Sequence, residues 1–348
     1  MQKYCENIVV GNGIMAKQLM FGIKDIFSDI TCISSKDFAP DCSSNSTSIN
    51  CLRGTKRGTS KLGDLILDSH KSFESFYNKY EAHGISKSYE VQTWTNLGDS
   101  HAKWLRRYGK FEMSKEFKFS KNLSSKELCV VNTDAYIIST KEFFNWYKKQ
   151  LSSIKFKEGF VEKILKDEDN YYLTLKSGCV YKCKRLFLCT GYLSGEFLNL
   201  VKDLQERESL AKQKKVYGHY LHYNLKKDED CGFDLANSFS FSYDFIRLIY
   251  RKETHDFVIS FPDINKNAFL FSKEPLKDMY QSFVDTLNLE NMPSFESFIL
   301  KQGIRSKGHK RMPFFGEVNQ NLFLFSGLYK NAFVFSYYFT DKLLARFK

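Results

Sequence analysis

The segment that decides the fold is Tyr4-Cys5-Glu6-Asn7-Ile8-Val9-Val10-Gly11-Asn12-Gly13-Ile14-Met15-Ala16. It predicts an apolar strand and a glycine turn, followed by a helix whose periodicity continues to Ile26. This order is typical of a dinucleotide-binding domain, because glycines let the backbone bring a pyrophosphate to a helix N-terminus, where unpaired N–H groups favour anions. Small Ala16 lets the helix pack closely on the strand. The motif alone is weak, so an ordinary strand-turn-helix unit remains the alternative.

The composition indicates a folded protein with a substantial interior. The chain has 348 residues, 43% hydrophobic and 16% aromatic, which is enough to bury one large core or two moderate ones. Its apolar runs are too short to cross a bilayer, and Lys3 and Glu6 stand where a signal peptide needs apolar residues. We therefore expect a soluble, cytoplasmic protein. The nine scattered cysteines predict reduced core thiols, and the single close pair, Cys179 and Cys183, is not enough to predict a metal site.

The net charge of +12 suits an anionic partner, either an acidic substrate or nucleic acid. Lysines are spread along the whole chain, however, and the densest basic groups, at 103–110, 212–215 and 305–311, are short. This distribution favours a lysine-rich solvated surface over an RNA-binding footprint.

The second strand, Ile30 to Ser35, departs from the usual dinucleotide pattern. An acidic residue commonly ends this strand and accepts hydrogen bonds from the adenosine ribose, but this chain has Ser34 there. A serine can also hydrogen-bond a ribose hydroxyl, but that bond is weaker than the charge-assisted bond of a carboxylate. Residues 41–59 then form a loop rich in Ser, Thr, Gly and Asn. Its length favours a functional loop over a ligand rather than a flexible linker.

The rest of the chain predicts two kinds of layer. Helices are expected at 62–76 and 143–151, followed by strands at 160–165, 171–175, 179–181 and 185–189, the last leading into Thr190-Gly191. Alternating aromatic residues between 216 and 271 favour a largely antiparallel sheet with one face inside, in a second domain. A helix at 276–287, strands at 303–305, 312–316 and 321–327, and a last helix at 331–347 complete the pattern. We expect that last helix to pack on the first domain.

Taken in order, these pieces resemble the FAD-dependent D-amino-acid oxidase superfamily, most closely its glycine oxidase and sarcosine oxidase branch. The resemblance rests on the following segments: Gly11 to Ala16, Thr47-Ser48, Ser60 to Leu65, Cys189-Thr190-Gly191, Gly303-Ile304-Arg305, Pro313, Gly316, and Gly327 to Phe333. The last segment is similar to the family's Gly-His-Tyr-Arg-Asn-Gly signature, which lies at the flavin ring. The resemblance spans the whole chain.

The resemblance implies an α/β fold with a Rossmann-like FAD-binding domain and an α+β second domain built on an antiparallel sheet that covers the substrate. The FAD-binding domain would take residues 1–60, 130–195 and 300–348, and the substrate domain residues 61–129 and 196–299. The residues it implies for FAD binding are Gly11, Gly13, Ile14, Met15, Ala16, Ser34, Ser35, Lys36, Thr47, Ser48, Val161, Thr190, Gly191, Gly327, Leu328, Tyr329, Lys330, Asn331, Ala332 and Phe333.

The same resemblance implies substrate contacts. Arg305 matches the arginine that holds the substrate carboxylate, a task that suits its planar two-donor fork, although the residues alone are equally consistent with a surface arginine. Lys330 would share that anion. Tyr250, or a nearby tyrosine of the sheet, would give a second contact, whereas the residues alone favour a core position for each of these aromatics.

The expected reaction is oxidation of a C–N bond in an amino acid or secondary amine, by hydride transfer to flavin N5. Ser34, Leu328, Lys330 and Ala332 depart from the family pattern, which implies a substrate other than glycine or a less tightly held flavin. Two alternatives stay open. One is the same chemistry on a modified tRNA or other macromolecule, and the other is an FAD-binding protein without oxidase activity.

Overall fold

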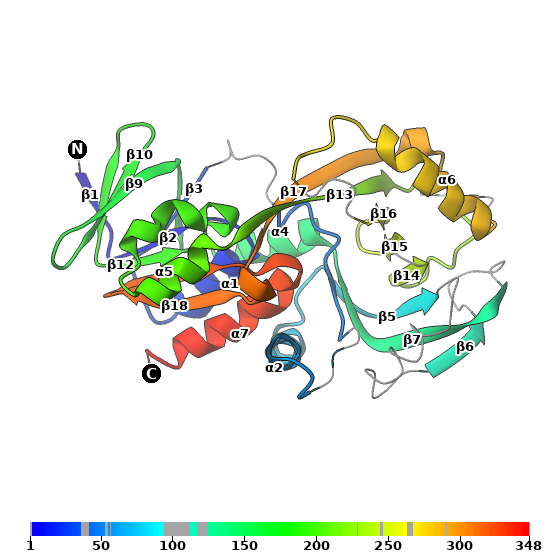
Figure 1. Cartoon of the computed structure of the whole chain (residues 1–348), viewed down its shortest axis with the longest axis horizontal. Coiled ribbons are helices and arrows are strands. Elements are labelled where there is room, and N and C mark those ends of the chain that lie inside the picture. Colours follow the sequence, from blue (N-terminus) through cyan, green and yellow to red (C-terminus); the bar gives the residue numbers. More distant parts are fainter. Residues whose placement is uncertain are drawn as a thin grey trace.

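The computed structural model describes residues 2–35, 42–52, 55, 57–93, 112–116, 124–227, 229–243, 246–262, 267–289 and 291–347. Figure 1 shows two lobes lying side by side, with both chain ends in the same lobe. We call the lobe with the termini the dinucleotide lobe and the other the sheet lobe. Among the described residues, the strands form three sheets.

The central sheet of the dinucleotide lobe is mostly parallel. Its strand order is β18 (Phe314–Asn319), β19 (Leu322–Ser326), β12 (Arg185–Leu188), β2 (Asn7–Val10), β3 (Ile30–Ser34) and β8 (Lys155–Glu158), and only β18 runs antiparallel to its neighbour. Successive residues of β2 enter different hydrophobic clusters, Val9 on one face and Ile8 and Val10 on the other. Both faces of the sheet are therefore covered, which explains why its strands are unbroken apolar runs in the sequence.

Helices cover one face of this sheet. They are α1 (Ile14–Ile23), α2 (Lys61–Tyr80), α4 (Thr140–Gln150) and α7 (Ala332–Leu344), and residues from all four share one hydrophobic cluster. The other face carries a small sheet of β1 (Gln2–Tyr4), β11 (Val180–Cys183), β10 (Tyr171–Leu175) and β9 (Val161–Lys166), together with the 3-10 segment η1 (Gly191–Leu200) and α5 (Leu204–Ala211). The turn after β2 and the end of β12 thus lie between two packed layers.

The sheet lobe has one large, mainly antiparallel sheet. Its order is β17 (Ile299–Lys307), β13 (Lys214–Asn224), β16 (Asp256–Ser260), β15 (Ile246–Arg251), β14 (Phe239–Tyr243), β5 (Ile85–Thr93), β7 (Ser124–Ile138) and β4 (Ile49–Asn50), with β6 (Glu112–Glu116) on β7. Only β14 and β5 pair in parallel. The helix α6 (Lys277–Thr286) and the 3-10 turns η2 (Glu274–Leu276) and η3 (Phe295–Ser297) pack on one face, where aromatic side chains supply much of the core.

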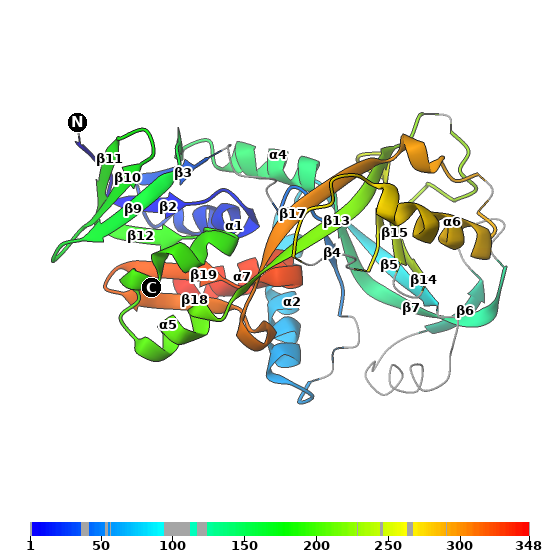
Figure 2. The ribbon, with the colours of Figure 1, turned by 45° about the horizontal axis from the view of Figure 1, so that its top comes forward.

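Two long strands join the lobes. β13 and β17 pair in register from Lys214 opposite Lys307 to His222 opposite Ile299, and both views show this ribbon running from the dinucleotide lobe into the large sheet. Figure 2 also shows α4 lying near the point where the ribbon leaves the dinucleotide lobe.

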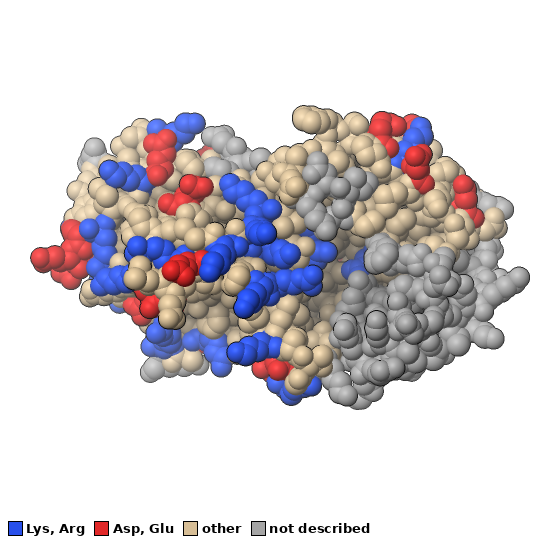
Figure 3. Space-filling view, in the orientation of Figure 1, with Lys and Arg blue, Asp and Glu red and all other residues tan. Residues whose placement is uncertain are grey.

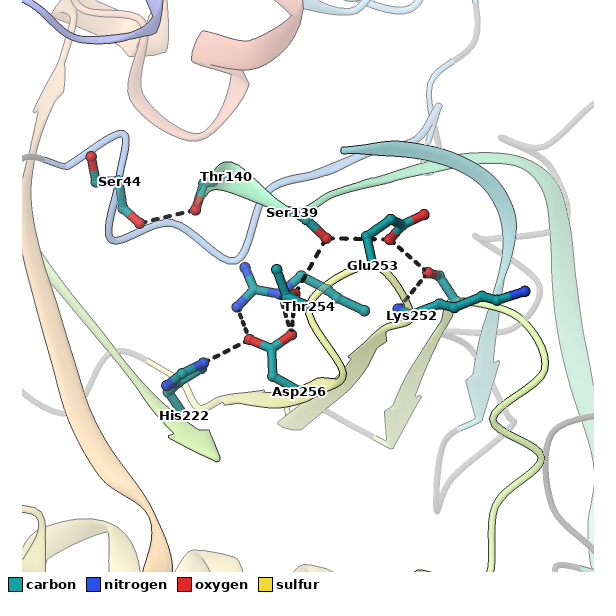
Figure 4. Close-up of polar contacts among 10 residues, drawn as sticks. Ser44, Ser139, Thr140, His222, Lys252, Glu253, Thr254 and Asp256 are labelled. Carbon is teal, nitrogen blue, oxygen red and sulfur yellow. Dashed lines mark hydrogen bonds and ion pairs between the residues drawn. The ribbon is translucent and has the colours of Figure 1, made fainter. Parts of the chain in front are cut away.

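Polar contacts hold the β15–β16 turn against the start of α4 (Figure 4). Asp256 is buried and accepts hydrogen bonds from Arg251 and from Thr254 Oγ1, the latter at 2.7 Å. His222 Nε2 lies 2.6 Å from the same carboxylate. Ser139 Oγ, at the start of α4, lies within 3.4 Å of Thr254 Oγ1 and 3.3 Å of a Glu253 oxygen. The two lobes are therefore tied by these side chains as well as by the β13–β17 ribbon.

The fold class predicted from the sequence is confirmed, including the antiparallel sheet of the second domain. Two local expectations were wrong. The single strand predicted over residues 4–10 is in fact two strands in different sheets. Strand pairing is interrupted at Cys5 and Glu6, so β1 pairs with β11 in the small sheet while β2 pairs with β12 in the central sheet. The strand predicted at 185–189 was expected to continue the run of strands from 160 to 181. It is β12, which pairs with β2 in the central sheet and is not part of the small sheet. None of the described helices is long and apolar enough to cross a membrane.

The domain boundaries stay a prediction, but several elements pack in the lobe opposite to the one those boundaries assign to them. α2, predicted to belong to the substrate domain, packs with α1 and α7 in the dinucleotide lobe. Residues 196–211, also assigned to the substrate domain, form part of η1 and α5 and cover the central sheet. Conversely β17, assigned to the FAD-binding domain, is paired along its length with β13 in the large sheet.

Candidate functional site

A cavity of about 1500 Å³ lies where the two lobes meet. Its walls come from the β2–α1 turn, the end of β3, α4, the β8–β9 connection, residues 189–197, β17 and the segment before α7. Ordinary small-ligand pockets hold roughly 300–1000 Å³, so this cavity has room for a dinucleotide together with a small substrate. The predicted residues that line it are Gly11, Gly13, Ile14, Met15, Ser34, Ser35, Val161, Thr190, Gly191, Arg305, Gly327, Leu328, Tyr329 and Ala332.

The β2–α1 turn forms the middle of the cavity wall. Gly11 has φ +115°, and a β-carbon there would lie 2.4 Å from the Cys189 carbonyl oxygen. Only glycine fits this close approach of two strands. α1 has no acidic residue in its first turn and begins at Gly13 without a side-chain cap, although Ser43 Oγ accepts a hydrogen bond from the Ile14 N–H at 3.1 Å. The helix end therefore remains favourable for an anion.

Arg305 lies at one end of the cavity, against the ring of Tyr329. Its guanidinium carbon is 5.5 Å from the ring centroid, and the ammonium groups of Lys307 and Lys330 lie 5.8 and 5.6 Å from the same centroid. Three cations thus surround one aromatic ring, and two of these four residues, Arg305 and Tyr329, line the cavity. Such a concentration of positive charge favours an anionic ligand at this end.

The backbone that carries Tyr329 is tightly constrained. Gly327 has φ +72°, and a β-carbon on it would lie 2.9 Å from the α-carbon of Gly308. Tyr329 itself has φ +50°, which is uncommon for a bulky residue. Lys307 and Leu328 form a bridge next to this approach. The packing of the two glycines therefore holds the aromatic ring in a fixed place beside Arg305.

A small polar cluster lies in the same part of the cavity. Ser306 and Ser326 both line it and are buried. Gln213 Oε1 lies 3.1 Å from Ser306 Oγ and 2.7 Å from Ser326 Oγ, which is also 3.2 Å from the Gly191 carbonyl oxygen. These groups are neutral hydrogen-bonding partners, so they can orient a ligand without adding charge.

Two ionisable side chains of the wall are held neutral. Burial raises the pKa of the Cys189 thiol, and nearby Cys32 adds to the effect, so Cys189 is not a thiolate nucleophile at neutral pH. Burial, with the neighbouring Tyr217, also raises the pKa of Tyr192, over whose ring Lys215 Nζ lies at 5.2 Å. Tyr192 therefore stays a phenol, able to donate a hydrogen bond.

The other end of the cavity is formed by β3, β8 and α4. Ser34, Glu158 and Val161 line it, together with Phe144 of α4 and Phe156 of β8. Phe156 keeps 44% of its surface exposed although it is a large apolar residue. This end offers aromatic surface, two carboxylates (Glu158 and Glu162) and two lysines (Lys148 and Lys157), whereas the Arg305 end carries cations around one aromatic ring.

Several predicted residues do not line the cavity. Tyr250 is 1% exposed inside the sheet lobe, packed on Phe239 and Phe257, with its hydroxyl 3.0 Å from His255 Nδ1. The substrate contact expected from it is corrected, because alternation along β15 turns this side chain toward α6. The other predicted residues that do not line the cavity are Ala16, Thr47, Ser48, Lys330, Asn331 and Phe333. Lys36 lies outside the described residues.

Some wall residues were not predicted from the sequence. Ser43 and Cys42 fall inside the loop that was expected to cover a ligand, and only their place beside α1 and Gly303 singles them out. Glu158 lines the wall because of strand register, which a single sequence does not reveal. Gly218 does not itself line the cavity, but register places it against the side chain of Arg305, which does. A useful signal was present for Gly218, since glycine is unusual inside a strand and often marks a close approach.

Comparison with solved structures identifies the fold. The chain superposes on glycine oxidase from Geobacillus kaustophilus with a TM-score of 0.76 and 14% identity, covering 99% of this chain and 94% of that one. Iminodiacetate oxidase from Chelativorans sp. BNC1 gives 0.75 and 11%, covering 97% and 93%. The chain has the fold of these oxidases. The resemblance seen in the sequence is thereby confirmed at the level of the fold.

A third structure extends this oxidase fold to another substrate. The dithionite-reduced L-α-glycerophosphate oxidase of Mycoplasma pneumoniae, with FAD bound, gives a TM-score of 0.76 at 10% identity, covering 98% of this chain and 94% of that one. No protein-family model matches the chain, and no curated protein matches it in sequence. At such low identities the oxidase fold says nothing of this chain's own substrate.

Proposed function

We propose that this chain is an FAD-dependent oxidoreductase that oxidises a C–N bond of an amino acid or secondary amine. The observation that carries the proposal is the single continuous cavity that joins the Gly11–Gly13 turn to Arg305 and Tyr329. A dinucleotide at the turn and a carboxylate at Arg305 would thus share one cavity. The solved structures with this fold include oxidases of glycine and iminodiacetate, which are amines with carboxylates.

The residues of the cavity fit FAD. Gly11 and Gly13 leave the backbone bare at the start of α1, where the helix favours the pyrophosphate. The segment Gly327 to Ala332 would lie along the flavin ring, and Ser34 with Val161 would lie near the adenosine. When bound, the flavin supplies the oxidising power by accepting a hydride.

The chain's own residues would bind and orient the substrate. Arg305 would hold a carboxylate with a two-donor fork, while Lys307 and Lys330 add positive charge at the rim. Ser306 and Ser326 would bond the amine end as neutral partners. Holding the Cα–H of the substrate at a fixed place is the main catalytic requirement, so the proposal does not need a dedicated catalytic base.

The test is the visible spectrum of the purified protein, followed by anaerobic mixing with a panel of amines that includes glycine, iminodiacetate and L-proline. We expect a yellow protein that releases flavin on denaturation and whose visible absorbance is bleached by at least one of these compounds. A colourless protein that does not take up added FAD contradicts the proposal. A yellow protein that no amine reduces favours the alternative, a flavin-binding protein without oxidase activity.

A second candidate, oxidation of a modified RNA, is favoured by the surface outside the cavity. Figure 3 shows basic side chains gathered on the face where α5, the start of β13 and the 3-10 turn η4 (His309–Arg311) lie in Figure 1. We use the name basic surface for the exposed basic residues of these segments, with Lys307 opposite Lys214 and Lys330 beside the Tyr329 ring; its members are Lys212, Lys214, Lys215, Lys307, Lys310, Arg311 and Lys330. Lys214 and Lys307 are opposite each other in the β13–β17 register. Like charges so placed destabilise a sheet, so an anionic partner would relieve a real cost.

The salt dependence of RNA binding tests this candidate. If the basic surface binds RNA, affinity should fall steeply with salt, and Lys214→Glu with Lys307→Glu should weaken binding and flatten that dependence. Lys176→Glu, on an exposed turn of the small sheet, is the matched control. RNA affinity that is weak in low salt and unchanged by the paired substitution rules out the RNA candidate.

A further inference from the structure

The chain lacks a carboxylate at the end of β3, where dinucleotide-binding folds commonly place one for the adenosine ribose. Ser34 stands there and lines the cavity. Its hydroxyl is too short and too weak an acceptor to replace a carboxylate that bonds two ribose hydroxyls at once. The question is whether another strand supplies the missing group.

The next strand, β8, brings a carboxylate to the same place. β8 runs parallel to β3, with Ser34 as the register partner of Glu158, and the Gly159 N–H donates to the Ser34 carbonyl oxygen at 2.9 Å. Register partners on parallel strands face the same side of a sheet and lie about 5 Å apart. Glu158 also lines the cavity. A glutamate side chain is long enough to bridge that spacing, so the carboxylate can reach the space above Ser34.

Phe156 adds an independent observation. It is two residues before Glu158, and therefore on the same face of β8, and it lines the cavity with 44% of its surface exposed. An exposed aromatic side chain in a cavity wall is a stacking surface for a flat ring. One short strand thus offers a stacking surface and a carboxylate two residues apart, which suits a purine and the ribose attached to it.

We propose that Glu158, on β8, binds the adenosine ribose of FAD in place of the carboxylate missing from β3. The inference rests on the proposed function, since it needs FAD in this cavity. The Glu158 carboxylate accepts hydrogen bonds from the 2′ and 3′ hydroxyls, and Phe156 packs against the adenine. Glu162, on β9, also lines the cavity but is not paired with β3.

The first experiment measures FAD affinity by titrating the apoprotein and following flavin fluorescence. Glu158→Ala should raise the FAD dissociation constant about tenfold or more, as for loss of a charge-assisted hydrogen bond. Glu162→Ala, the matched control in the same wall, should change it little. FMN, which has no adenosine, should bind both variants as it binds the wild type. Circular dichroism verifies that the exposed substitution leaves the fold intact.

Moving the carboxylate between strands gives a sharper test. In the Glu158→Ala background, Ser34→Glu should restore FAD affinity, because the carboxylate then occupies the usual position on β3. In the wild-type background the same Ser34→Glu change should not improve affinity, since two carboxylates would lie opposite each other in register.

An FAD analogue that carries 2′-deoxyadenosine tests whether Glu158 bonds the 2′ hydroxyl of the ribose. It should bind wild type more weakly than FAD does, whereas Glu158→Ala should bind the two ligands about equally. Equal losses in both proteins, or an unchanged affinity of Glu158→Ala for FAD, overturn the role of Glu158 and leave the proposed function standing. Failure of the wild type to bind FAD at all contradicts the proposed function itself.

Discussion

The guanidinium of Arg305 occupies the space in which a side chain at Gly218 would stand. A β-carbon on Gly218 would lie 2.1 Å from a terminal nitrogen of Arg305, on the neighbouring strand of the β13–β17 ribbon. Because the obstructing atoms are the far end of a flexible side chain, a substitution would move the arginine rather than unfold the sheet. The missing side chain at 218 thus sets where Arg305 points.

Gly218→Ala should therefore weaken substrate binding without removing FAD. We expect KM for an amino-acid substrate to rise while the affinity for FAD and the melting temperature stay close to the wild type, since only the guanidinium is displaced. Steady-state kinetics and FAD titration measure the two effects. Gly195→Ala is the control, because a β-carbon there meets nothing within 4 Å. A variant with unchanged KM means that Arg305 does not act from its present position.

Arg305→Ala tests the arginine directly. If the substrate carries a carboxylate, KM should rise about tenfold or more while FAD stays bound, because breaking such a charge-assisted pair costs roughly 2 to 5 kcal/mol. Arg305→Lys should recover only part of the loss, since an ammonium group lacks the two-donor fork. Unaltered kinetics in Arg305→Ala would leave the oxidation of uncharged amines, or no catalytic role.

Gly11→Ala should abolish or severely weaken FAD binding. The added methyl group would lie 2.4 Å from the Cys189 carbonyl oxygen, and the residue would keep a φ of +115° that side chains rarely adopt. Backbone strain of this kind costs on the order of 1 to 3 kcal/mol, before the clash is counted. Gly178→Ala separates the two causes, because Gly178 also has positive φ but open space around it. FAD retained by Gly11→Ala as tightly as by Gly178→Ala would remove the turn from the binding site.

Asp256→Asn should destabilise the fold. Burial alone would raise the pKa of this carboxyl, but hydrogen bonds from His222, Arg251 and Thr254 and the charge of Arg251 outweigh burial and hold the pKa below its usual range. Removing the charge leaves Arg251 buried without its partner, at a cost of about 3 to 5 kcal/mol. Chemical denaturation measures the loss. Asp68→Asn, in the exposed pair with Arg57, should change stability little.

The carboxylate of Asp256 also makes the stability of the fold depend on pH, in a direction that its pKa shift determines. Because the pKa of Asp256 is lower in the folded than in the unfolded chain, its stabilisation is complete above the unfolded pKa of about 3.9. It is lost as the pH falls below that value, toward the folded pKa. Wild type should therefore lose stability more steeply than Asp256→Asn as the pH falls below about 4. Parallel pH profiles for the two proteins would mean that folding does not lower the pKa of Asp256.

Local patterns predicted much of the fold. The apolar run before Gly11, the helical spacing after it and the aromatic alternation from 216 onward each depend on neighbours within a few residues, and all three became the expected elements. The position of β1 could not be predicted in this way. Its partner β11 lies about 180 residues away in the sequence. The interruption between β1 and β2 lies at Cys5, whose N–H donates to the Lys182 carbonyl oxygen.

The distinction between signals from neighbouring residues and signals from distant strands also applies to the cavity wall and to the residues that position it. Gly11, Gly13 and Gly327 are parts of short motifs, so the sequence alone points to them. Glu158 and Gly218 matter only because of what faces them on another strand, Ser34 in one case and Arg305 in the other. Tyr250 shows the opposite error, since an aromatic in an alternating strand can face either the ligand or the core, and this one faces the core.

The β13–β17 ribbon has a consequence for the timing of turnover. Hinges in enzymes are short loops or the ends of elements, and this connection between the lobes is instead two hydrogen-bonded strands, paired from Lys214–Lys307 to His222–Ile299. Arg305 sits within that paired region, so the lobe-to-lobe rotation that closes many clefts would have to break ladder hydrogen bonds beside it. Ligands should instead enter and leave without a rotation of one lobe against the other. Catalysis would then be limited by chemistry or product release, with no slow domain closure to wait for.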